Sequence, residues 1–138
     1  MSHTSRNICI VYGLIALAAL FATWSQNLQP SHTSYLLDLK ASPASRSFTV
    51  DIGFFLLAGA ILMVLEARRL GVRLVWLYVI FGFLIAISVT FPLFLIAREM
   101  RLAKIGAGPY PVKLTISDLV GLILLTGVVL ALTGFILT

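Results

Sequence analysis

The sequence has few charged side chains. Asp, Glu, Lys and Arg make up 11% of its 138 residues, against about 25% in an ordinary soluble domain. Hydrophobic residues make up 60%. So few charges would not cover the surface of a water-soluble globule of this length. The composition therefore excludes a water-soluble globule and predicts an integral membrane protein.

Cysteine and histidine are also scarce. The single cysteine, Cys9, excludes an internal disulfide and a thiolate metal cluster. His3 and His32 have no second ligand at metal spacing, and the sequence contains no phosphate-binding loop or nucleophile elbow. The formal net charge is +5, but the basic residues stand between apolar runs and not along one helix face. We therefore expect no metal, no cofactor and no nucleic acid, and a lipid bilayer as the first partner.

Four apolar runs approach the roughly 20 residues that a helix needs to cross a hydrocarbon core of about 30 Å. None alternates apolar and polar residues as the strands of a membrane barrel do. The sequence therefore predicts an all-α integral membrane protein, a bundle of four transmembrane helices in one domain over residues 1–138. The predicted helices cover about residues 8–24, 47–67, 74–97 and 115–138. We expect the first to be a retained anchor and not a cleaved signal peptide.

Three connectors join the predicted helices. Residues 25–46 form a polar connector in which a short apolar piece predicts a turn at the membrane surface. In the basic turn 68–73, Gly71 predicts a helix C-cap and a sharp reversal. If the helices alternate direction, four Lys/Arg residues lie on one side of the membrane and six on the other. That difference leaves the orientation open.

The second predicted helix carries the candidate catalytic residues, Asp51 and Glu66. Only 14 uncharged residues separate them, a length of about 21 Å that is too short to cross the apolar core. At least one carboxylate would then lie at membrane depth, where an ionisable group usually has a partner or a task. The structural alternatives are a helix-start role for Asp51 near Ser47 and Thr49, and an ion pair between Glu66 and Arg69.

Alternating helices would also bring four residues into one layer: Trp24, Asp51, Arg98 and Asp118. Of these, Trp24, Arg98 and Asp118 are candidates for lipid or partner contact. Asp118 also has the alternative of capping its own helix beside Thr115. In the third helix, Pro92 leaves the carbonyl of Ser88 without its usual donor, which predicts a kink and makes Pro92 a further contact candidate. Small residues at four-residue spacing predict close helix packing at Ala18, Ala22, Gly82, Ala86, Gly121, Gly127 and Ala131.

One combination of motifs resembles a known family. An Asp early in one helix, an E-x-R-R-L turn, a Trp and the pattern S-x-x-x-P-L-F-L-x-x-R-E occur between residues 48 and 101, at Asp51, Glu66, Arg68, Arg69, Leu70, Trp76, Ser88, Pro92, Leu93, Phe94, Leu95, Arg98 and Glu99. This segment resembles a small bacterial membrane-protein family catalogued as domain of unknown function 2834. The resemblance implies a multi-pass protein of the bacterial inner or plasma membrane and no reaction. The helix from Thr115 onward looks like an addition to the family's shorter form.

Three functions fit these features. The first is a non-enzymatic accessory or assembly subunit that packs against other membrane proteins or against a second copy of itself. The second is a small membrane enzyme acting on a lipophilic, isoprenoid-like substrate with Asp51 or Glu66 as the acid. The third is a proton-coupled transporter of small solutes, although the first predicted helix contains no acid. We expect the first of these functions.

Overall fold

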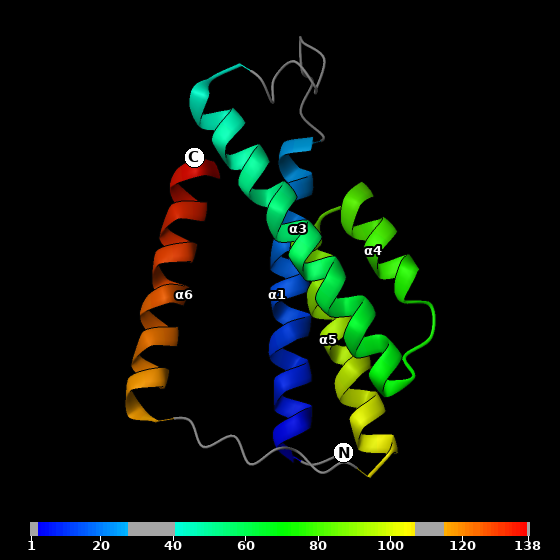
Figure 1. Ribbon diagram of the computed structural model, residues 1–138. Coiled ribbons are helices and arrows are strands. Elements are labelled where there is room, and N and C mark those ends of the chain that lie inside the picture. Colours follow the sequence, from blue (N-terminus) through cyan, green and yellow to red (C-terminus); the bar gives the residue numbers. More distant parts are fainter. Residues whose placement is uncertain (1–2, 28–40, 107–114, 138) are drawn as a thin grey trace.

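The computed structural model describes residues 3–27, 41–106 and 115–137, and within them the chain forms five helices (Figure 1). The all-α fold predicted from the sequence is confirmed. The predicted surface turn within residues 25–46 lies almost wholly outside the described residues. The helices are α1 (His3–Asn27), α3 (Pro43–Leu70), α4 (Val75–Leu84), α5 (Ile87–Lys104) and α6 (Ile116–Leu137).

The ends of α3 follow from its sequence. Ser42 caps the first turn by accepting a hydrogen bond from the backbone N–H of Ser45 at 3.0 Å, and Pro43 occupies the first position, where no donor is needed. Gly71 ends the helix in the left-handed conformation (φ 67°) and donates its N–H to the carbonyl of Ala67. The predicted C-cap at Gly71 is thus confirmed. Because α3 begins at Pro43, Asp51 lies two turns inside the helix, beyond the reach of a helix-start role.

The predicted single helix over residues 74–97 is wrong, and with it the count of four helices. The chain breaks at Ile85 and Ala86, and Ala86 has an extended backbone (φ −177°, ψ 137°). Pro92, where the sequence predicts a kink, lies inside α5, and the break stands one to two turns before it. The reversal folds α4 back against α5, so residues 74–97 turn round instead of running straight (Figure 1).

Contacts between α3 and α5 show that these two helices run in the same direction. A Cβ on Gly59 would lie 3.8 Å from Ile87 Cδ1, near the start of α5. Eleven residues further along α3, the carbonyl of Leu70 accepts a hydrogen bond from Arg101, near the end of α5. The short helix α4 lies between them in the chain and packs on both, while α1 packs along α5 (Figure 1).

The core of the described helices is small and lies between α3, α4 and α5. Met63 and Phe94 are fully buried, and Ala67, Val75 and Ile87 complete the cluster. The ring of Phe94 meets that of Tyr78 edge to face, with centroids 5.8 Å apart.

Outside this core most large apolar side chains of the described residues are exposed. Two helices, α1 over His3–Ser25 and α3 over Pro43–Leu70, are long and apolar enough to cross a membrane.

Helix α6 stands apart from the other four helices (Figure 1). Every side chain from Ile116 to Ala131 is exposed, and a Cβ on Gly121 or Gly127 would meet nothing within 4 Å. Its start is well formed, since Thr115 and Asp118 exchange hydrogen bonds between side chain and backbone at 2.9 and 3.3 Å. The capping alternative for Asp118 is therefore confirmed.

Candidate functional site

Charged side chains from two helices and a serine from a third meet at one end of the molecule. Arg98 on α5 donates from Nε to Glu66 Oε1 on α3 at 2.8 Å, and from Nη1 to Glu99 Oε1 at 3.0 Å. Ser5, in the first turn of α1, donates to Glu99 Oε2 at 3.3 Å. Glu66 also lies 3.7 Å from Arg69, so the predicted ion pair of these two residues is confirmed. The cluster joins α1, α3 and α5.

The geometry of the cluster suits a structural contact between helices. The side chains of Glu66 and Glu99 are 15% and 14% exposed, and that of Arg98 is 28% exposed. One guanidinium thus spans two half-buried carboxylates, and the lower dielectric there strengthens each hydrogen bond. Glu66 faces two cations and lines none of the four described cavities. This position suits an ion pair between helices better than an acid that works on a substrate.

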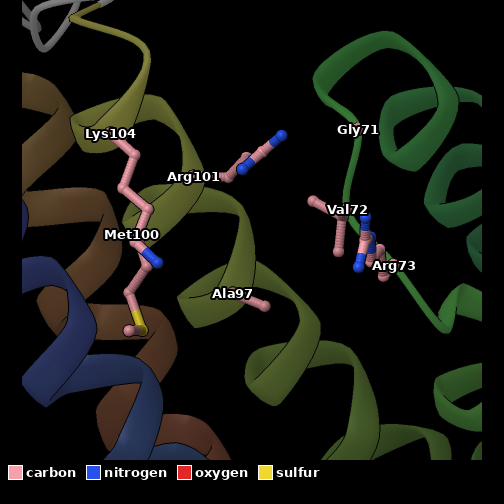
Figure 2. Close-up of a pocket in the computed structure, with 7 residues that line it drawn as sticks. All are labelled: Gly71, Val72, Arg73, Ala97, Met100, Arg101 and Lys104. Carbon is pink, nitrogen blue, oxygen red and sulfur yellow. The ribbon is translucent and has the colours of Figure 1, made fainter.

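A basic cleft lies beside this cluster. Its walls are the turn after α3 and the last two turns of α5, and its volume is about 340 Å³. Figure 2 shows Arg101 reaching across the cleft toward the turn, Arg73 on the opposite wall, and Lys104 on the same helix as Arg101. The lining includes three cations and no carboxylate. This arrangement can attract and hydrogen-bond an anion.

The turn that forms one wall is held by backbone contacts. Arg101 donates from Nε to the carbonyl of Leu70 at 3.0 Å, and Val72 donates its N–H to Ala67 at 2.9 Å. A Cβ on Gly71 would lie 3.2 Å from Arg101 Nη2, so glycine is needed both for the left-handed backbone and for this approach. Leu74 is the one non-glycine residue with positive φ (60°) in the described part of the chain.

The predicted layer of Trp24, Asp51, Arg98 and Asp118 is wrong. Arg98 pairs with Glu66, which lies 15 positions and about 22 Å along α3 from Asp51. The physical reason is the reversal at Ile85 and Ala86, which brings the end of α5 to the end of α3 and not to its start. Asp51 is exposed, Trp24 is 40% exposed near the end of α1, and Asp118 begins the separate α6.

The predicted packing residues divide into two groups. Gly82 is buried, and a Cβ there would lie 2.8 Å from Thr90 Oγ1 on α5 and 3.6 Å from Leu56 on α3. Ala22 and Ala86 are half-buried, and Pro92, which the sequence predicts as a contact residue and not as a packing residue, is buried. The remaining predicted positions are exposed, namely Ala18, Gly121, Gly127 and Ala131. Small residues thus mark a close helix approach at Gly82, and on α6 they have no neighbour within the described chain.

Sequence reasoning did not predict a site role for five residues of the charged end, although Glu99 belongs to the family pattern: Ser5, Arg73, Glu99, Arg101 and Lys104. Their signal was present, because basic residues stand on both sides of the apolar run 74–97. A run that crosses the membrane separates those two groups, whereas a run that folds back unites them. Among the described residues, no group of three His, Cys, Asp or Glu side chains is arranged to hold a metal ion.

Comparison with known proteins gives one match. The family model described as protein of unknown function DUF2834 matches residues 8–100. The match includes most of α1, all of α3 and α4, and α5 to Met100, so it is wider than the resembling segment 48–101 and leaves α6 outside. No curated protein and no solved structure matches the chain.

Proposed function

The chain belongs to the family of proteins of unknown function DUF2834, and we propose that it is a multi-pass membrane protein that acts as a non-enzymatic accessory or assembly subunit. The observation that carries this proposal is α6, an apolar helix with every side chain from Ile116 to Ala131 exposed. An apolar helix in this state needs lipid, a partner helix or both.

The membrane location is supported by helix length and by what the helices expose. At 1.5 Å per residue, the 23 residues of His3–Ser25 and the 28 of Pro43–Leu70 extend about 35 and 42 Å, which exceeds a hydrocarbon core of about 30 Å. Phe21, Phe54 and Leu65 on these helices are 74%, 69% and 64% exposed. Side chains of this kind are costly in water and suited to lipid.

The reversal between α4 and α5 also supports an orientation. Seven described cations lie on the segments that end at the charged cluster: Arg6, Arg68, Arg69, Arg73, Arg98, Arg101 and Lys104. At the opposite end of α3 the described cation is Arg46. Because cytoplasmic loops carry the excess of Lys and Arg, we place the charged cluster on the cytoplasmic side. In this arrangement α1 and α3 cross the bilayer, and α4 with α5 forms a hairpin that enters and leaves on that side.

The surface of α6 supports a partner helix. The small residues Gly121, Gly127 and Ala131 fall within about 120° around the helix axis. Residues of this size let another backbone approach closely inside a membrane, where no hydrophobic force drives helices together. Glu66, one of the two candidate acids of the enzyme alternative, is instead engaged by Arg98 and Arg69.

The test is purification of the full chain from native membranes in lipid nanodiscs, followed by mass spectrometry of the proteins and lipids that accompany it. We expect a protein partner at fixed ratio. The double variant Gly121→Leu/Gly127→Leu should lose that partner, whereas Thr126→Leu, on the opposite face of α6, should keep it. A chain recovered without partner, or with one enriched isoprenoid-like lipid that Asp51→Asn releases, would contradict the proposal.

A further inference from the structure

The basic cleft at the cytoplasmic end has the charge distribution of an anion site. Arg73, Arg101 and Lys104 line it, and no carboxylate does. The nearby carboxylates of Glu66 and Glu99 both accept hydrogen bonds from Arg98. The field inside the cleft therefore comes from three cations that no acid on its walls offsets.

One of these cations is held in place by the backbone. Arg101 Nε donates to the carbonyl of Leu70 at 3.0 Å, which uses one of the five N–H donors of a guanidinium. The same bond occupies a carbonyl oxygen at the end of α3 that would otherwise repel an anion. Gly71 gives the guanidinium the space to reach the turn, as Figure 2 shows. A positioned guanidinium loses little freedom on binding an anion.

An apolar groove neighbours the basic cleft, and Arg73 lines both. The groove runs between α4 and α5, has a volume of about 400 Å³, and is lined mainly by apolar and aromatic side chains that include Leu77, Phe81 and Leu93. Three cations at one end and an apolar groove at the other match the two halves of an anionic lipid. A free phosphate would use the cleft alone.

We propose that this site binds an anionic phospholipid, with the headgroup phosphate in the cleft that Arg73, Arg101 and Lys104 line and an acyl chain along the groove between α4 and α5. The proposal rests on the membrane location proposed above and is independent of the partner of α6. Occupation of the site would tie the α4–α5 hairpin to the cytoplasmic leaflet, where anionic lipids supply the headgroups.

The experiment uses the purified full chain in detergent micelles, titrated with phosphatidylglycerol or with phosphatidylcholine of the same acyl chains and read by native mass spectrometry. We expect one phosphatidylglycerol to bind at least about tenfold more tightly than phosphatidylcholine. The double variant Arg73→Gln/Lys104→Gln should weaken the binding of phosphatidylglycerol about 30-fold. Arg69→Gln removes one positive charge from a side chain that is 68% exposed and outside the cleft, and should change binding less than about twofold.

The apolar half has its own variant. Phe81→Ala should weaken the binding of phosphatidylglycerol and leave the binding of inorganic phosphate unchanged, because only the lipid occupies the groove. Three outcomes would each overturn the proposal. The two lipids could bind equally, Arg69→Gln and the double variant could lose phosphatidylglycerol binding equally, or inorganic phosphate could displace the lipid at a similar concentration. Circular dichroism verifies that each variant is folded. Resistance to alkaline extraction tests the membrane location separately, and a missing protein partner does not affect these titrations.

Discussion

The packed helices α1, α3, α4 and α5 and the separate helix α6 are both strongly apolar, yet only the first group forms a core. In the packed group Met63 and Phe94 are fully buried and Arg98 ties α5 to α3. On α6 every side chain from Ile116 to Ala131 is exposed. Hydropathy therefore does not decide which helices associate. Close contacts at small residues and a few polar bonds decide it, as expected where lipid is as apolar as the side chains.

The largest expected effect concerns whether Arg68 and Ile105 lie on the same side of the membrane. In a Cys9→Ser background, single cysteines at Arg68→Cys and Ile105→Cys should react with an impermeant thiol reagent from the cytoplasmic side, and Ala44→Cys from the opposite side. The reason is that α4 folds back on α5, so that in the proposed arrangement the hairpin returns the chain to its side of entry. Labelling of Arg68→Cys and Ile105→Cys from opposite sides would show that residues 74–97 cross the membrane as one helix.

Arg98→Ala should give the largest loss of stability in the packed helices. The substitution leaves Glu66 and Glu99 half-buried without the guanidinium that joins them. We expect a loss of about 2 kcal/mol, below the usual range for a fully buried pair because Arg98 is partly exposed. Thermal unfolding in detergent measures it. Asp118→Asn, which removes a charge from α6, should leave the unfolding of the packed helices unchanged. An equal loss of stability in Arg98→Ala and Asp118→Asn would contradict the difference between the packed helices and α6.

Gly82→Ala should destabilise the packed helices by about 1 to 2 kcal/mol. The added Cβ would lie 2.8 Å from Thr90 Oγ1 and 3.4 Å from Ile87 Cδ1, so α4 would have to move away from α5. Gly121→Ala is the matched substitution on α6, where a Cβ meets nothing within 4 Å. It should be neutral or slightly stabilising, because alanine favours a helix over glycine by about 1 kcal/mol. Similar unfolding temperatures for the two variants would contradict the close approach at Gly82.

The residues explain why part of this structure was predictable. Apolar runs located α1, α3 and α6, and Gly71 and the Thr115–Asp118 pair marked a helix end and a helix start. The reversal was not predictable, because Ile85 and Ala86 carry no turn signal and the whole run 74–97 is uncharged. A turn of this kind depends on tertiary contacts at Gly82 and Thr90, which a sequence pattern does not contain. The error then moved Arg98 to the wrong end and hid its pairing with Glu66.

The smallest expected effect follows from removing α6. A chain that ends after Gly106 should have the same free energy of unfolding as the full chain, within about 0.5 kcal/mol. The reason is that the described side chains of α6 contribute no buried surface to the core. The shortened chain should also bind phosphatidylglycerol as before, since the cleft and the groove lie wholly within α3, α4, α5 and their connections. If the shortened chain loses only the co-purifying partner, α6 is the helix that binds that partner. A large drop in stability would instead show that α6 packs on the core in a membrane.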